Sequence, residues 1–180
     1  MAVSNKAIAG VRETRKGATI HKTNERPGTR AQVRYVRVSA YKAREVLDLI
    51  AESAVAVTEA KACAMRLLNR TTGELELTSQ YGLSDEYASQ GPVSVTHSPL
   101  DQAVLEDNVL QIHDVRRDAR FQYPKEAERE GIVSVLSVPL VIKDQPRGVI
   151  RVYAGRPRHF DGHQVRLLQA FARHAAIAIE

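Results

Sequence analysis

Two neighbouring runs of apolar residues in the last third of the chain predict a β-hairpin. The first, residues 132–142, is apolar at odd and even positions alike, as in a strand that is covered on both faces. The second, residues 147–154, places Arg151 and Tyr153 on one face and Ile150 on the other. An arginine in the middle of such a strand is unusual, and it is the main chemical clue in the sequence.

The periodicity elsewhere predicts an alternation of helices and strands. Ser98 and Asp161 are expected N-caps, each placed directly before a helical pattern. The predicted helices cover residues 41–59, 84–88, 99–107, 125–130 and 162–180, the predicted strands cover residues 62–69, 74–81 and 109–113, and the hairpin turn covers residues 143–146. This order is typical of an α+β fold around a central antiparallel sheet.

Length and composition limit the class of protein. The chain has 180 residues, 43% of them hydrophobic, which is enough for one domain with a substantial core plus an extension. No window has the roughly 20 apolar residues that span a bilayer, and the N-terminus lacks the apolar core of a signal peptide. The single cysteine, Cys63, cannot form an internal disulfide. We therefore expect a cytoplasmic protein with no membrane contact.

The positive charge is concentrated at the N-terminus. Residues 1–44 hold eleven Lys and Arg against two acids, whereas the remainder is mildly acidic. Residues 1–30 also have little apolar periodicity, so we expect a largely disordered basic arm over residues 1–40, followed by one domain over residues 41–180. The arm fits a solvated tail or a nucleic-acid contact, and composition leaves both open.

One stretch favours nucleic acid. The run RAQVRYVRVSAYKAREVLDLI, residues 30–50, resembles the start of the bacterial large-subunit ribosomal protein twenty-two family, whose members contact ribosomal RNA. Arg34, Arg37, Lys42 and Arg44 match by motif. The likeness then ends, because that family's next helix and long basic hairpin are absent. RNA binding through residues 1–44 is therefore an alternative function.

A second resemblance covers about three quarters of the chain. The matching segments are LDLIAESAVAVTEAKACAMRLLN, GELELTSQYGLS, SPLDQAVLEDN, IHDVRRDARFQYPKEAEREGIVSVLSVPL, GVIRVYA and QAFARHAAIAIE. In this order they resemble a GAF domain over residues 44–180, the small-molecule sensor module of many bacterial signalling proteins. The resemblance implies terminal helices on one sheet face and, on the other, a pocket under the loops and short helices of residues 82–131.

The strand pattern puts Arg66 and Arg151 on the pocket face of that fold. A buried charge without a partner costs several kcal/mol, so each guanidinium needs an anionic neighbour. The planar fork of arginine suits carboxylate or phosphate, which predicts a small anionic ligand. Internal pairing with Asp114, Glu74 or Glu76 is the alternative.

Further side chains are expected around the same pocket. Tyr153 shares a face with Arg151, and Ser134 and Leu136 are expected on the same wall, an assignment that depends on the hairpin register. Phe121 and Tyr123 lie on a polar loop that lids the pocket in the resembled family. They would stack on a ligand or plug the core.

The chain offers no constellation for catalysis. No nucleophile–base pair or carboxylate dyad stands out, the six histidines show no metal-ligand spacing, and no cofactor is expected. GAF domains that reduce methionine sulfoxide use several cysteines, and this chain has one. We therefore expect a non-enzymatic module. The apolar stripes of the helix predicted over residues 162–180, together with the resemblance to GAF domains, imply a homodimer through the terminal helices that signals to an effector such as a histidine kinase. A structural dimerisation module with an empty pocket is the further alternative.

Overall fold

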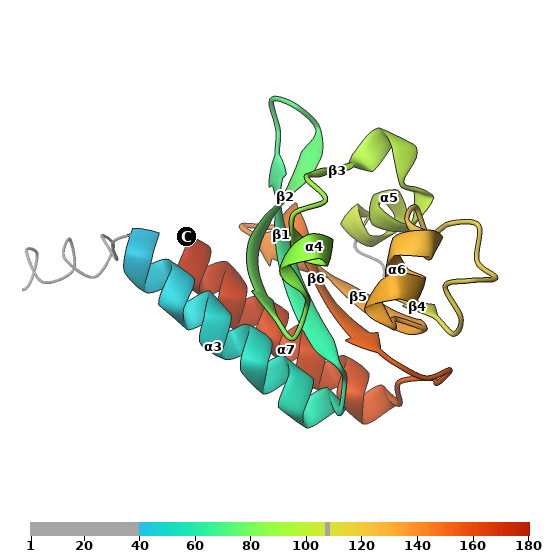
Figure 1. Cartoon of the computed structure of the whole chain (residues 1–180). Coiled ribbons are helices and arrows are strands. Elements are labelled where there is room, and N and C mark those ends of the chain that lie inside the picture. The colour runs from blue at the N-terminus through green and yellow to red at the C-terminus, as the bar shows by residue number, and fades with distance from the viewer. Residues whose placement is uncertain (1–39, 107–108) are drawn as a thin grey trace, which may run out of the picture. The chain divides into compact units, whose positions relative to one another are not determined.

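The computed structural model describes residues 40–106 and 109–180, so the basic arm predicted over residues 1–40 lies almost wholly outside the described residues. Six antiparallel strands form one sheet in the order β3-β2-β1-β6-β5-β4 (Figure 1). The elements are α3 (Ala40–Thr58), β1 (Ala62–Asn69), β2 (Glu74–Tyr81), α4 (Asp85–Ala88), β3 (Val93–Ser94), the 3-10 turn η2 (Val95–His97), α5 (Pro99–Leu105), β4 (Leu110–Ile112), α6 (Pro124–Glu130), β5 (Ser134–Ile142), β6 (Gln145–Ala154) and α7 (Gly162–Ile179).

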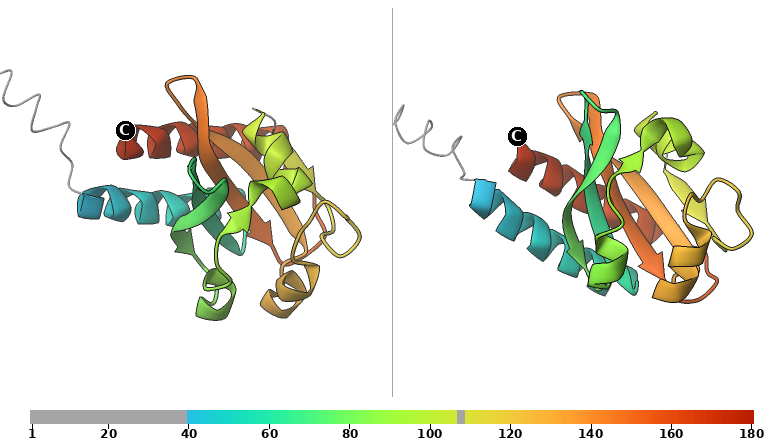
Figure 2. Two further views of the ribbon diagram at one scale, coloured as in Figure 1. Left: turned by 90° about the horizontal axis from the view of Figure 1, so that it is seen from above. Right: turned by 45° about the horizontal axis from the view of Figure 1, so that its top comes forward.

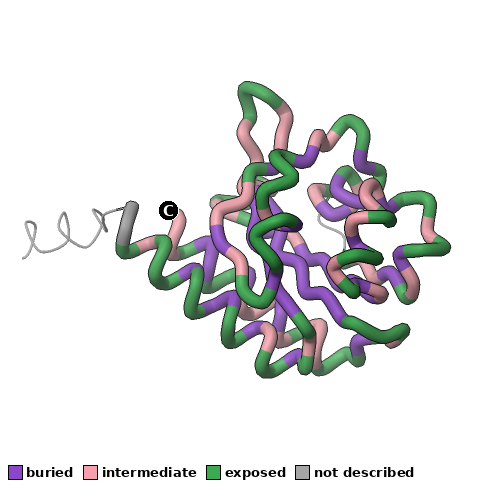
Figure 3. Tube along the Cα trace, viewed as in Figure 1, coloured by how far each residue is buried: buried purple, intermediate pink, exposed green. Residues whose placement is uncertain are grey.

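The two long helices and the three short ones cover opposite faces of the sheet. Helices α3 and α7 lie side by side on one face, and α4, α5, α6 and their loops cover the other (Figures 1 and 2). Buried residues follow the central strands and the sheet-facing sides of α3 and α7 (Figure 3). This confirms the predicted α+β fold and its two differently covered faces.

Each long helix buries one stripe. On α3 the buried stripe includes Leu47, Ile50 and Ala54, whereas the apolar side chain of Val46 is exposed. The helix is therefore turned so that part of its apolar surface faces outward. On α7 the buried residues are Leu168, Ala172, Ala175 and Ala176. The N-cap predicted at Asp161 is confirmed: its side chain accepts the backbone N–H groups of His163 and Gln164, and Gln164 completes a capping box.

A bulge in the β5–β6 hairpin sets which side chains face the pocket. The turn is two residues, Lys143 and Asp144, both with positive φ, 51° and 57°. The register then shifts between Leu140 and Val141, and Arg147 is the extra residue of β6 that pairs with no residue of β5. Because side chains alternate faces, a shift of one residue exchanges the two faces of β5 relative to β6.

Gly148 follows the bulge directly, at a place where β6 approaches β1 closely. A Cβ built on Gly148 would lie 2.2 Å from the backbone oxygen of Arg66. Only glycine fits this position without moving a strand.

The two elements that the sequence did not predict, β3 and η2, are two and three residues long, too short for periodicity to reveal. None of the helices that the structure describes has the length and apolarity to cross a membrane.

Candidate functional site

The two buried arginines lie on the same face of neighbouring strands, as predicted. Ala64 of β1 pairs with Arg151 of β6, and Arg66 pairs with Val149, so the arginines are diagonal neighbours on the floor of one pocket. Arg66 is 6% exposed and Arg151 is 7% exposed. The face is the one covered by the short helices, because Ala64 and Tyr153 pack in that layer of the core.

Arg151 already has an anionic partner inside the protein. Its Nη2 donates to Oδ1 of Asp101 at 2.5 Å, and its Nε donates to the Ser137 hydroxyl at 2.7 Å. Asp101 is 2% exposed and lies in the first turn of α5. Burial alone would lower the pKa of Arg151, but the Asp101 carboxylate, together with Tyr153 and Tyr87, raises it, so the pKa lies above its ordinary value. The guanidinium and carboxylate therefore form a buried ion pair.

Ser98 holds the partner carboxylate in place. Its hydroxyl donates to Oδ2 of Asp101 at 2.6 Å while accepting the Asp101 backbone N–H, which completes the helix cap. Both carboxylate oxygens of Asp101 are therefore occupied. Leu100 and Val104, which are buried, anchor α5 to the core.

Arg66 has weaker partners. Its Nη1 lies 3.3 Å from the Gly91 carbonyl and 3.5 Å from the Leu75 carbonyl. Across residues 40–106 and 109–180, no carboxylate forms an ion pair with it. Backbone carbonyls accept hydrogen bonds but supply no net negative charge, so Arg66 is a buried cation that is not neutralised.

Aromatic side chains close the pocket above this floor. Tyr87 meets Tyr153 edge to face, with ring centroids 6.1 Å apart, and Phe121 and Tyr123 complete the lining as predicted. Burial raises the pKa of both Tyr87 and Tyr153, which keeps these phenols protonated as hydrogen-bond donors. The Oε1 of Gln122, on the same lid loop, is buried and has no hydrogen-bond partner in the part of the chain that the structure describes. About 20 Å³ of space remains, roughly room for one water molecule.

Hydrogen bonds join α4 and α6, two of the three short helices. Glu130, at the end of α6, accepts the backbone N–H of Ser84 at 3.0 Å with one oxygen and the Ser84 hydroxyl with the other. Lys61 donates to the Glu130 backbone carbonyl. Since Ser84 caps α4, these contacts fasten α4 to α6.

Ser134 and Leu136 do not lie on this wall, contrary to the prediction. The bulge pairs Ser134 with Ala154 and Leu136 with Val152, on the face that packs against α3 and α7. Their neighbours take the predicted places: Val135 lies opposite Tyr153, and Ser137 lies opposite Arg151.

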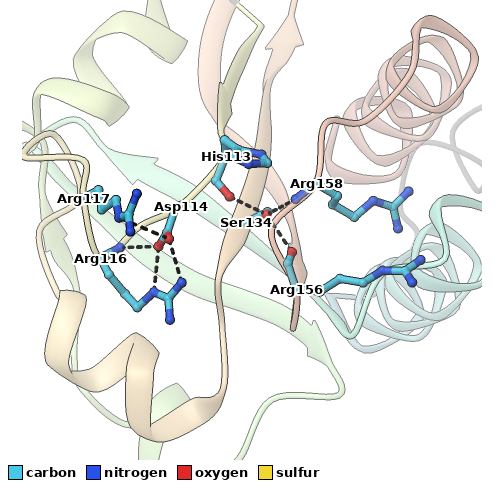
Figure 4. A network of polar contacts seen from close by, with 7 residues as sticks. All are labelled: His113, Asp114, Arg116, Arg117, Ser134, Arg156 and Arg158. Carbon is cyan, nitrogen blue, oxygen red and sulfur yellow. Dashed lines mark hydrogen bonds and ion pairs between the residues drawn. The ribbon is translucent and has the colours of Figure 1, made fainter.

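Ser134 instead links two loops on the edge of the domain (Figure 4). Its Oγ lies 2.7 Å from the His113 carbonyl and 2.8 Å from the Arg156 carbonyl, and it accepts the Arg158 backbone N–H at 2.8 Å. The first loop leads from β4 into the pocket lid, and the second leads from β6 into α7. Ser134 therefore connects the lid loop to the start of a long helix.

The carboxylates that were expected to neutralise the arginines are engaged or placed elsewhere. Asp114 binds Arg116 through both oxygens, at 2.8 and 2.6 Å, and this pairing holds its pKa at about 2 (Figure 4). Glu76 accepts a hydrogen bond from Asn69. Neither these two nor Glu74 lines the pocket, so the prediction of these internal partners was wrong, and Asp101 has that role.

Sequence reasoning missed Asp101 although a signal was present. The segment Ser98-Pro-Leu-Asp101 has the spacing of a helix cap, and the cap accounts for only part of what the carboxylate does. Nothing in the local pattern indicates that its other oxygen meets an arginine 50 residues further along the chain.

The remaining reactive side chains lie outside the pocket lining. Cys63 is buried in β1 on the face toward α3 and α7, and burial raises the pKa of its thiol. His113 and His159 stack with ring centroids 4.6 Å apart, and both are exposed. Among the residues that the structure describes, no three or more His, Cys, Asp or Glu side chains gather in a way that fits a metal ion.

Comparison with solved structures shows the same fold in proteins of distant sequence. The GAF domain of a phosphoenolpyruvate-protein phosphotransferase from Coxiella burnetii superposes with a TM-score of 0.69 at 16% identity, covering 83% of this chain and 89% of that one. A domain assigned to a two-component sensor histidine kinase from Sinorhizobium meliloti gives 0.62 at 19% identity, covering 75% and 88%. A type II free methionine-R-sulfoxide reductase from Thermoplasma acidophilum gives 0.65 at 16% identity, covering 78% and 93%.

The sequence comparisons identify the family. A search of curated proteins finds no match. The likeness of residues 30–50 to a ribosomal protein family is not shown by any comparison, and RNA binding by that region stays a prediction. The family model for the GAF domain matches residues 42–180, nearly the whole of the described structure, and the chain therefore belongs to the GAF domain family.

Proposed function

We propose that this GAF domain is a non-catalytic sensor of a small anion in a cytoplasmic bacterial signalling protein. The observation that carries the proposal is Arg66, a guanidinium in the pocket floor that is 6% exposed and whose only hydrogen-bond partners among the described residues are carbonyls at 3.3 and 3.5 Å. An anion in the pocket would supply the missing charge through a charge-assisted hydrogen bond. The protonated hydroxyls of Tyr87 and Tyr153 would be further donors nearby.

Binding would move the lid. The closed pocket has room for roughly one water molecule, so most ligands must displace the aromatic side chains of Phe121 and Tyr123. These residues follow the loop that Ser134 ties to the start of α7. Displacement of the lid would therefore move the start of α7 through the contacts of Ser134. In a dimer, the resulting shift of α3 and α7 would transmit the conformational change to an effector such as a histidine kinase.

A non-catalytic role is supported by the chemistry of the lining. The only cysteine of the chain, Cys63, is buried on the opposite sheet face, where a raised thiol pKa opposes nucleophilic attack. Among the described residues, the pocket lining contains one carboxylate, Asp101, and both of its oxygens are already bound. Neither group has the geometry of a nucleophile beside its base.

The proposal is tested by the thermal stability of the wild type and of Arg66→Gln against carboxylates, phosphates and nucleotides. At a concentration well above its dissociation constant, a bound anion should raise the unfolding temperature of the wild type by about 5 °C. The same anion should leave Arg66→Gln unchanged. Arg70→Gln, which removes an exposed arginine four positions further on, is the matched control and should respond as the wild type does. A panel without any shift in the wild type would contradict the anion sensor.

The dimer is a second testable part of the proposal. Leu49 on α3 is 62% exposed and Ile177 on α7 is 71% exposed, with Val46 and Val57 also exposed on α3. Large exposed apolar side chains on adjacent helices are typical of an interface. Light scattering should therefore report a dimer for the wild type and a monomer for Leu49→Glu combined with Ile177→Glu. Thr72→Glu, in the β1–β2 turn, should stay dimeric, and a monomeric wild type would remove the relay.

One alternative also has an observation in its favour. Arg151 is paired internally with Asp101, and the closed pocket is nearly filled, as expected of a structural dimerisation module whose pocket binds nothing. That function predicts a dimer in the second experiment and no anion response in the first. The two experiments together therefore separate a sensor from a module that only dimerises.

A further inference from the structure

The formal charges around the pocket are few. Among the described residues that line it, Arg66, Arg151 and Asp101 carry charge. The Arg151–Asp101 ion pair is neutral as a unit, which leaves one positive charge, on Arg66. The two arginines are therefore not equivalent, because one is satisfied within the protein and the other is not.

We infer that the pocket selects monoanions over dianions, with Asp101 as the residue that sets this preference. The inference rests on the proposed anion-sensing function and names the charge class of its ligand. A monoanion on Arg66 brings the pocket to neutrality. A dianion brings a second negative charge into the buried pocket, where Arg151 is already neutralised by Asp101. The carboxylate of Asp101 lines the same pocket and repels this second charge.

Asp101 fits this role because it is fixed in position. One oxygen is bound to Arg151 and the other to the Ser98 hydroxyl, and α5 is anchored by buried Leu100 and Val104. A ligand that displaced the Asp101 carboxylate would leave that buried negative charge and the Ser98 hydroxyl without partners. The free energy of this displacement would be unfavourable. The negative charge therefore stays in the pocket when a ligand enters, and it repels a second one.

The experiment compares anions that match in shape and differ in charge. The pairs are methanesulfonate against sulfate, and malonamate, the monoamide of malonate, against malonate, at constant ionic strength and mildly alkaline pH. Calorimetric titration of the wild-type protein should give a dissociation constant about tenfold or more lower for each monoanion than for its dianionic partner. Arg66→Gln should bind none of the four.

Asp101→Asn tests the residue itself. It keeps a side chain of the same shape and raises the charge of the pocket by one, so the preference for the monoanion should vanish or reverse. Asp114→Asn removes a carboxylate that pairs with Arg116 outside the pocket lining, so it changes the net charge equally and should keep the wild-type preference. If Asp101→Asn does not fold, the wild-type titrations decide alone.

The outcomes separate this inference from the function on which it rests. If none of the four anions binds the wild type, the charge selection fails, and the wider panel of carboxylates, phosphates and nucleotides decides the anion sensor. If both members of a pair bind the wild type equally, the sensor stands and the charge selection is wrong. The selection is also wrong if Asp101→Asn folds and retains the wild-type ratio.

Discussion

Asp101→Ala is expected to lower the free energy of unfolding by about 3–5 kcal/mol. The change removes the only anionic partner of Arg151 among the described residues and leaves the guanidinium almost fully buried. The change also removes the carboxylate oxygen that accepts the hydrogen bond of the Ser98 hydroxyl at the start of α5. The loss is large because it includes the desolvation of an uncompensated charge, in addition to the attraction between the two groups. Urea unfolding followed by circular dichroism measures it.

Two further variants distinguish this explanation from simple loss of packing. Asp114→Ala removes a carboxylate from the exposed pair with Arg116 and should cost far less, since solvent screens that interaction. Replacing both partners, Asp101→Leu with Arg151→Met, should recover most of the stability because no unpaired charge remains. A loss below about 1 kcal/mol for Asp101→Ala would mean that Arg151 finds another acceptor and that the ion pair is not structurally important.

The strand pattern and the resemblance to a GAF domain together placed the arginines. Alternation along β1 and β6 puts Arg66 with Ala64, and Arg151 with Tyr153, and the structure has both sets on the pocket face. The period of two fixes the faces of each strand by itself. It does not fix how one strand faces another, and this is the step at which Ser134 and Leu136 were assigned to the wrong wall.

The hairpin error has one physical cause. A two-residue turn with regular pairing would put Ser134 and Leu136 opposite Tyr153 and Arg151, whereas the extra residue Arg147 moves every later pair by one. The Asp101 error has a different cause, because that contact joins residues 50 apart whose approach depends on the packing of α5 over β6. The local sequence pattern predicts which face of a strand a residue occupies and where a helix is capped. It predicts neither the position of a bulge nor an ion pair between residues far apart in the sequence.

The asymmetry between the two arginines connects the fold to the proposed function. If both were paired internally, the pocket would need no ligand, and if neither were, the apoprotein would contain two uncompensated charges. One ion pair and one unneutralised arginine keep the free domain folded while leaving an electrostatic reason to bind an anion. The response to a ligand should therefore depend on Arg66, and the stability of the free domain on Arg151 and Asp101.

Gly148→Ala should lower the free energy of unfolding by about 3 kcal/mol and also weaken any anion response. The added Cβ would lie 2.2 Å from the Arg66 backbone oxygen and 3.1 Å from the Cα of Leu67. Both contacts are with the main chain of β1, which cannot rotate away as a side chain can. The β1–β6 pairing must therefore open locally, at the residue whose side chain supplies the uncompensated charge of the pocket.

The matched control is Gly162→Ala, at the first residue of α7. There the new Cβ would meet only the end of the flexible Arg166 side chain, at 3.3 Å, and alanine favours the helix, so the stability should be unchanged or raised by up to about 1 kcal/mol. Urea unfolding compares the two variants. Hydrogen exchange of the β1 and β6 amides reports whether the strands separate at Arg66, as the clash requires. Unchanged stability and exchange in Gly148→Ala would show that the close approach of β6 to β1 does not hold Arg66 in place.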